Sequence, residues 1–111
     1  MNKLQFSPLA RQDLQDIKTY IEVELQNPVA AVNVITKIIK HLHILVDHPR
    51  SGAPLSSVVD AETDYRFLVC GNYTAFYHYE DETVYVVRVL YGRRDYMKIL
   101  FGELPDEEIE K

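Results

Sequence analysis

Cysteine is nearly absent from this chain of 111 residues, and its single copy, Cys70, excludes an intramolecular disulfide. Long apolar runs are absent too: the longest, such as 29–32 and 84–87, fall far short of the roughly 20 residues of a membrane-spanning helix. The first seven residues hold no apolar core of a signal peptide. The sequence therefore predicts a cytoplasmic protein that is not inserted in a membrane.

Patterns that hold cofactors are also missing. The four glycines are scattered, and none belongs to a Gly-rich loop that could hold a nucleotide phosphate. His41 and His43 lie two apart on a predicted helix and point in different directions, so they cannot share a metal. Cys70 has no recognisable catalytic partner, and His78 is expected to be a packing residue. We therefore expect no metal and no cofactor.

The acidic charge of the chain is concentrated at its end. The formal net charge is −5, but residues 103–111 hold five acidic side chains against Lys111. The first 102 residues hold 11 basic and 12 acidic side chains, and such a nearly neutral body can still carry a basic patch on one face. We expect one soluble domain, 1–102, and an acidic tail, 103–111. The tail is either a solubilising end or a phosphate mimic that folds over arginines.

Two helices are expected in the first half of the chain. The alternating segment 3–6 predicts a short strand. The Ser-Pro pair at 7–8 supplies an N-cap and a first helical residue, and apolar residues at three- and four-residue spacings continue the helix to about Leu25. The Asn-Pro pair at 27–28 repeats this pattern and predicts a second helix to about Asp47.

The second predicted helix is apolar around more of its circumference than a surface helix needs. One interpretation is that the helix is wedged between a sheet and the first helix. The other is that its additional apolar side chains bind a partner protein. These additional side chains are Ala31, Val34, Ile38 and Leu45.

The second half of the chain changes to a period of two, which is typical of strands. After a loop over 48–63, three strands are expected, joined by Gly71-Asn72 and by an acidic turn near Asp81-Glu82. The predicted strands are 65–70, 73–79 and 83–91. The predicted fold is therefore α+β: an N-terminal strand, a two-helix hairpin, a three-stranded antiparallel meander and a short C-terminal helix capped by Asp95.

Two-residue turns fix the expected pairing of these strands. In the first hairpin, Cys70 pairs with Tyr73, Leu68 with Ala75 and Arg66 with Tyr77; in the second, Tyr77 pairs with Val86 and Ala75 with Arg88. Arg66 and Arg88 then share an open face with three tyrosines, Tyr73, Tyr77 and Tyr79. The opposite face is expected to be buried under the helices, and it contains Phe67, Val69, Phe76, Val87 and Val89. A one-residue bulge would move one arginine to the other face.

The predicted open face combines arginines with tyrosines, and Gly92 delivers Arg93 and Arg94 to its edge. Guanidinium groups form bidentate contacts with phosphate and phenol rings stack on bases, so this pattern is typical of nucleic-acid binding. The alternative is that Arg66 and Arg88 form ion pairs on a solvated sheet. Carboxylates considered for that pairing are Glu62, Asp64 and Asp95.

An ordered set of short motifs resembles the RelE/ParE superfamily of toxins from bacterial type II toxin–antitoxin systems. The motifs are Ser7-Pro8-Leu9-Ala10, Asp64-Tyr65-Arg66, Gly71-Asn72-Tyr73, Phe76-Tyr77 and the run from Val86 to Tyr96 that contains Gly92-Arg93-Arg94-Asp95. The resemblance implies a small toxin that inhibits growth until a cognate antitoxin binds its helices and sheet, in a toxin–antitoxin hetero-oligomer. It assigns antitoxin binding to Ala31, Val34, Ile38 and Leu45.

Two activities occur in this superfamily: inhibition of DNA gyrase by ParE-like members and ribosome-dependent cleavage of messenger RNA by RelE-like members. The nuclease is a metal-independent endoribonuclease, whose residues would here be Arg66, Arg94 and Tyr96. Thr74 and Leu100 replace an arginine and a tyrosine of that pattern, so the gyrase inhibitor is favoured over the nuclease and over an inactive antitoxin-binding module. The expected target-binding residues are Arg88, Arg93, Arg94, Tyr73 and Tyr77.

Overall fold

A pair of helices and a mixed sheet make up the part of the chain that the computed structural model describes, residues 2–57 and 63–92. In chain order the elements are β1 (Lys3–Phe6), α1 (Pro8–Thr19), η1 (Tyr20–Glu24), α2 (Pro28–Leu42), α3 (Ile44–Asp47), β2 (Ala53–Pro54), η2 (Leu55–Ser57), β3 (Arg66–Cys70), β4 (Tyr73–Glu80) and β5 (Thr83–Tyr91). The predicted C-terminal helix and the acidic tail lie outside the described residues.

The helix starts follow from the two cap-and-proline pairs. The hydroxyl oxygen of Ser7 accepts a hydrogen bond from the N–H of Ala10 at 2.9 Å, and the amide oxygen of Asn27 accepts one from Ala30 at 3.1 Å. The first predicted helix is confirmed, although its last turn, η1, is π-helical. The second is confirmed as α2 and α3, which are separated at His43.

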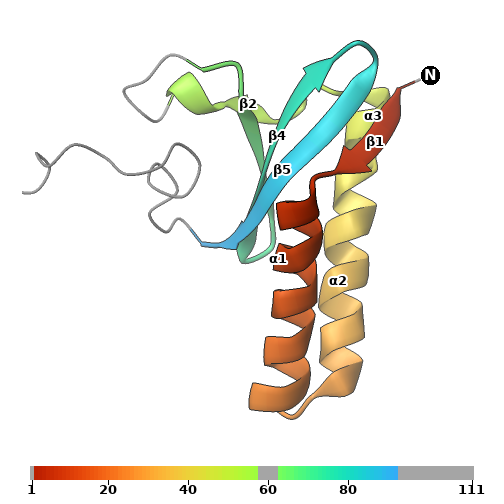
Figure 1. Ribbon diagram of the computed structural model, residues 1–111, viewed down its shortest axis with the longest axis vertical. Helices are drawn as coiled ribbons and strands as arrows, with labels where there is room; N and C mark the ends of the chain where they lie inside the picture. The colour runs from red at the N-terminus through yellow and green to blue at the C-terminus, as the bar shows by residue number, and fades with distance from the viewer. Residues whose placement is uncertain (1, 58–62, 93–111) are drawn as a thin grey trace, which may run out of the picture.

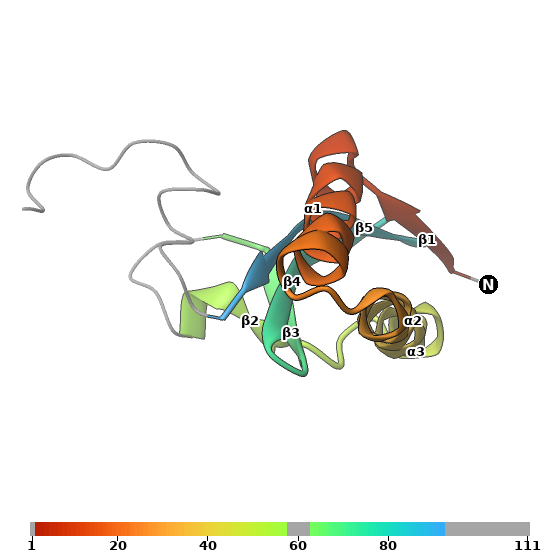
Figure 2. The same cartoon turned by 90° about the horizontal axis from the view of Figure 1, so that it is seen from below.

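The sheet order is β1-β5-β4-β3-β2, so the predicted meander β3-β4-β5 is confirmed at its centre (Figure 1). Two further strands flank it: β1 pairs in parallel with β5, and the two-residue β2 pairs antiparallel with the start of β3. Figure 1 shows α1 and α2 side by side, with the loop between them projecting beyond the strands. Figure 2 shows the hairpin nearly along its helix axes, in front of the sheet.

The predicted register is correct in the first hairpin and only partly correct in the second. Arg66 pairs with Tyr77, and Tyr77 pairs with Val86, as expected. A shift between Phe76 and Tyr77 then adds one residue to β5. Ala75 consequently pairs with Val89, and the predicted pairing of Ala75 with Arg88 is wrong.

The assignment of the two sheet faces is wrong except at Val89, because the helices cover the face that carries the tyrosines. Tyr77 is fully buried, and Tyr73 and Tyr79 pack against the core. The other buried strand residues of this core are Cys70, Ala75, Val84, Val86 and Val89. By contrast Val69, which was expected in the core, is 49% exposed. Phe76 is also buried, tilted against Phe67, on the other face.

Tyr77 explains how a tyrosine can occupy the centre of the core. Its hydroxyl donates to the carbonyl of Pro49 at 2.7 Å and accepts from the N–H of Gly52 at 3.0 Å. A buried phenol is stable when its hydroxyl finds such partners, because the ring itself is apolar. The hydroxyl also fixes the segment after α3 against the sheet.

By length and composition alone, one helical stretch of the described residues, Pro28–Asp47, could cross a membrane. Here its buried residues Ile38, Leu42 and Leu45 belong to the core that the helices share with the sheet. A core helix meets the same criteria, and this one carries Lys37 and Lys40 on its exposed side.

We predict that Gly52→Ala destabilises the protein by about 1–3 kcal/mol, which is typical of overpacked cores. A Cβ at this position would lie 2.5 Å from the carbonyl oxygen of Phe67 and 2.6 Å from the hydroxyl of Tyr77. Urea unfolding followed by circular dichroism measures the loss. The matched control is Ser51→Ala, at the exposed neighbouring position, and equal stability of the two variants would contradict the prediction.

Candidate functional site

Arg66 and Arg50 place positive charge at the start of β3. Nε of Arg66 donates to the carbonyl of Gly52 at 3.1 Å, and Nη2 donates to the carbonyl of Arg50 at 3.3 Å. The guanidinium of Arg50 lies 5.8 Å from the ring centroid of Tyr79, in a cation–π contact. Among the described residues, no carboxylate forms an ion pair with either arginine. This end of the sheet can therefore bind an anion.

Arg88 is not part of an open cationic face, which corrects the prediction that it lies beside Arg66. Its Nε and Nη2 donate to the two oxygens of Asp13 on α1, at 2.8 and 2.7 Å. The Asp13 carboxylate also accepts the N–H of Val89 at 2.9 Å. The two side chains are only 21% and 10% exposed, and the hydrogen bond with Asp13 raises the pKa of Arg88. Arg88 therefore joins α1 to β5.

Sequence reasoning missed Asp13, although a pattern pointed to it. Ala10, Asp13 and Ile17 lie on one face of α1 by their three- and four-residue spacings, and both apolar neighbours face the core. An acidic side chain on a buried helix face requires a basic or N–H partner. Asp13 is not among the carboxylates that the sequence suggested for Arg88.

The other predicted catalytic and target-binding residues are either buried, packed against the core or outside the described residues. Tyr77 is buried, so it does not contribute to a surface, and Arg93, Arg94 and Tyr96 lie outside the described residues. Thr74, at the position of the missing nuclease arginine, is buried and donates to the carbonyl of Gly92 at 3.0 Å. The described residues thus bring Arg66 together with Arg50, and not with Arg88.

An aromatic stack crosses the sheet, and no sequence pattern indicated it. The rings of Tyr65 and His78 are nearly parallel with centroids 5.8 Å apart, and the ring of Tyr85 lies 5.4 Å from that of His78. His78, which was expected from the sequence to be a packing residue, therefore packs between two tyrosines. Rings of this kind can stack on bases or on guanidinium groups.

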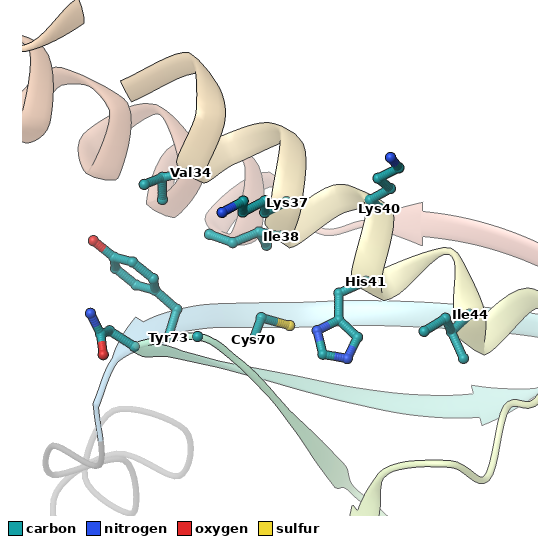
Figure 3. Close-up of a pocket in the computed structure, with 10 residues that line it drawn as sticks. Val34, Lys37, Ile38, Lys40, His41, Ile44, Cys70 and Tyr73 are labelled. Carbon is teal, nitrogen blue, oxygen red and sulfur yellow. The ribbon is translucent and has the colours of Figure 1, made fainter. Parts of the chain in front are cut away.

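A groove of about 530 Å³, which we call the α2–β3 groove, lies between α2 and the β3–β4 turn (Figure 3). Figure 3 shows His41 and Ile44 pointing toward the strands near Cys70, while Lys40 points away from them. The complete lining is Val34, Lys37, Ile38, Lys40, His41, Ile44, Cys70, Gly71, Asn72 and Tyr73. The groove thus has an apolar floor and a basic rim.

A second groove, of about 690 Å³, lies on the other side of Tyr73, between the helical hairpin and Tyr91. The ring of Tyr73 meets that of Tyr91 edge-on at 5.4 Å. The side chains of Tyr20, Leu25 and Tyr91 line this groove and are each more than half exposed. An apolar surface of this kind on a soluble protein indicates a binding site.

The helix residues predicted to bind an antitoxin are mostly not on the surface. Ala31, Ile38 and Leu45 are buried against the sheet and α1, and Val34 is partly buried where it lines both grooves. The first interpretation of this wide apolar helix, that it is wedged between the sheet and the first helix, is confirmed. The apolar side chains that α2 and its flanking residues expose are Val23, Leu25, Val29, Val32 and Ile44.

The thiol of Cys70 is a candidate nucleophile in the lining of the α2–β3 groove. Burial, however, raises the pKa of this thiol to about 11. The thiol is therefore protonated near neutral pH, and the protonated form is a poor nucleophile. In residues 2–57 and 63–92, no group of three His, Cys, Asp or Glu side chains could hold a metal ion.

A family model and a solved structure each match most of this chain. The family model described as the ParE toxin of type II toxin–antitoxin systems, parDE, matches residues 4–96. A structure of the chromosomal ParDE system from P. aeruginosa superposes with a TM-score of 0.71 at 21% identity, over 84% of this chain and 98% of that chain. None of the curated proteins compared with the chain matches it significantly.

Two structures of RelE-type proteins are more distant. A chain of the RelBE2 toxin–antitoxin complex from Mycobacterium tuberculosis has a TM-score of 0.59 at 21% identity, over 81% of this chain and 96% of that chain. The isolated RelE toxin from E. coli has a TM-score of 0.52 at 16% identity, over 91% and 97%. At these identities the structures establish a shared α+β fold.

We predict that Asp13→Asn lowers the free energy of unfolding by about 2–4 kcal/mol, because it leaves the Arg88 guanidinium poorly compensated in a largely buried site. Asp16→Asn is the matched control, since Asp16 is exposed on the same helix and should change stability by less than about 0.5 kcal/mol. Urea titrations of both variants measure the difference. Equal losses would show that the pair does not stabilise the fold.

We predict that Cys70 is alkylated slowly by iodoacetamide at pH 8 in the folded protein and faster as the pH approaches 11. In the unfolded chain the thiol has its ordinary pKa of 9.0, so it loses its proton at a lower pH than the folded thiol does. The free energy of unfolding should therefore fall as the pH rises from 9 to 11. Cys70→Ala should remove that part of the pH dependence. Rapid alkylation of folded protein at pH 8 would contradict the protonated, buried thiol.

Proposed function

Because the chain belongs to the ParE toxin family of type II toxin–antitoxin systems, we propose that it inhibits growth by acting on DNA gyrase until an antitoxin binds it. The observation that carries this proposal is the match of the ParE toxin model to residues 4–96, which include both helices and all of the sheet except Lys3. Gyrase is the target that the resemblance to ParE-like toxins implies.

The chemistry of the described residues favours the gyrase inhibitor over the nuclease. Metal-independent RNA cleavage needs cations beside the reacting phosphate and groups that transfer protons. Here Arg88 is committed to Asp13, and Thr74 binds backbone where the nuclease pattern has an arginine. A nearly neutral body is also poorly suited to the polyanionic ribosome.

We propose that the antitoxin covers the exposed apolar side of the helical hairpin together with the two grooves that Tyr73 separates. Val29 is 71% exposed and Val32 is 54% exposed, and burying such side chains against a partner is favourable by about 25 cal/mol per Å² of apolar surface. This replaces the surface that the sequence indicated, since Ala31, Ile38 and Leu45 are already buried. The complex would be a toxin–antitoxin hetero-oligomer.

We predict that the full chain inhibits supercoiling by DNA gyrase in vitro and does not cleave messenger RNA on programmed ribosomes. Arg93→Ala/Arg94→Ala should abolish both this inhibition and growth arrest, because we assign target binding to these two arginines. The control is Lys3→Ala/Arg11→Ala, which removes two exposed basic residues from the start of β1 and from α1. Circular dichroism should show that both double variants fold.

Three outcomes distinguish the candidate functions. If the chain cleaves messenger RNA at specific codons on ribosomes and does not inhibit gyrase, its function is that of an mRNA endoribonuclease and not of a gyrase inhibitor. Binding of an antitoxin with neither activity would identify an inactive antitoxin-binding module. Undiminished growth arrest by the Arg93→Ala/Arg94→Ala variant would refute the assigned role of these arginines.

A further inference from the structure

Three tyrosines from separate elements line one groove. This is the groove of about 690 Å³ on the Tyr91 side of Tyr73, which we call the tyrosine groove. Tyr20 is the first residue of η1, Tyr73 is the first of β4 and Tyr91 is the last of β5. These residues are far apart in the sequence, so only the tertiary structure brings their rings to one place.

The rings enclose the groove from more than one side. Tyr73 and Tyr91 meet at an interplanar angle of 71°, so they form adjoining walls and not a flat stack. Figure 3 shows the ring of Tyr73 rising from its strand toward Val34 on α2. Burial raises the pKa of Tyr73, and the neighbouring phenols of Tyr91 and Tyr20 add to that rise, which shows that the three phenols lie near one another. The groove is therefore an incomplete aromatic cage.

The charge around the tyrosine groove suits a cation. Of the described residues that line it, Asp16 alone is charged, and its carboxylate has a hydrogen bond from Gln12 but no ion pair within the described chain. The α2–β3 groove differs, because its described lining holds Lys37, Lys40 and His41 and no acidic residue. The two grooves that Tyr73 separates are thus suited to ligands of opposite charge.

We propose that the tyrosine groove binds a small organic cation, with its ammonium group between the rings beside Asp16 and its apolar part on Ile17 and Val34. Aromatic faces attract cations, and cages of several rings recognise alkylated ammonium groups. A volume of about 690 Å³ is in the range of small-ligand pockets. The proposal concerns the isolated chain, so it does not depend on which target the toxin has.

Two other kinds of ligand fit this groove less well. A phosphate or carboxylate would lie against the Asp16 carboxylate and the negative faces of the rings, and no basic residue of the described lining would offset them. A neutral apolar ligand would contact the rings and the aliphatic side chains but would gain nothing from Asp16. An organic cation uses the rings, the carboxylate and the apolar surface together.

The test uses the full chain and two probes of nearly the same shape, choline and 3,3-dimethylbutan-1-ol. In the second probe a quaternary carbon replaces the quaternary nitrogen, so the difference in affinity isolates the charge. Titration calorimetry should show that choline binds at least about tenfold more tightly, which corresponds to about 1.4 kcal/mol. Added salt should weaken the binding of choline. Equal affinities, or no binding of choline, would overturn the proposal.

Variants of the rings and of the carboxylate locate the cation. Tyr20→Leu and Tyr91→Leu should each weaken choline binding about fivefold, whereas Tyr20→Phe and Tyr91→Phe keep the ring face and should change it less than about twofold. Asp16→Asn should weaken binding several-fold, and its matched control Glu80→Gln, at the other end of β4, should not. Both tyrosines are more than half exposed, so thermal unfolding should show that all variants fold.

Tyrosine ring resonances give a readout that needs no variant. The chain has eight tyrosines, so those outside the groove serve as internal controls. Choline should shift the resonances of Tyr20, Tyr73 and Tyr91 and leave those of Tyr65 and Tyr85, in the aromatic stack, unchanged. Shifts confined to the stack, or binding that both leucine variants leave unaffected, would place the cation elsewhere and refute the site. Binding of a lysine-rich peptide without binding of choline would assign the groove to a protein partner and also refute it.

Discussion

The arrangement of α1 against the sheet depends on the hydrogen bonds that the Asp13 carboxylate accepts from β5. The parallel pairing of β1 with β5 ends at Phe6 and Val86, where the chain turns into α1. Beyond that point β5 would have an unpaired edge. The N–H of Ser7 donates to the carbonyl of Val86, and its hydroxyl donates to the carbonyl of Val87. The Asp13 carboxylate accepts from the N–H of Val89 and from the Arg88 guanidinium. The first turns of α1 therefore replace a strand.

This replacement has consequences for both sides of the sheet. The shifted register of β5 lies at the same place, and it brings Val89 into the core beside Ala75. Since Arg88 is committed to α1, the other arginine of the described strands is Arg66, which lies near Arg50 toward the opposite edge of the sheet. A single ion pair thus withdraws Arg88 from the cationic face that the sequence suggested, while Arg93 and Arg94 of that face lie outside the described residues.

The binding surfaces follow from the different lengths of helices and strands. The helical hairpin projects past the β3–β4 turn, so its apolar residues extend beyond the sheet that buries the rest of them (Figure 1). Tyr73 stands at the junction and divides the uncovered space into two grooves. These features lie on adjoining surfaces, where a single extended partner can contact all of them.

The sequence by itself determined the order and type of the elements, because capping pairs such as Ser7-Pro8 and a turn such as Gly71-Asn72 act on their immediate neighbours. Its motifs also indicated the superfamily. Only the tertiary structure decided which face of each element is buried. Tyr77 was assigned to the surface because the register pairs it with Arg66, on the face that was expected to be open. Its ring is buried instead, and its hydroxyl bonds to Pro49 and Gly52 in a distant loop. Arg88 pairs with Asp13, 75 residues away. Such contacts depend on the register of the strands and on which side of a helix faces the sheet. One inserted residue in a strand, as in β5, moves the side chains beyond it to the opposite face.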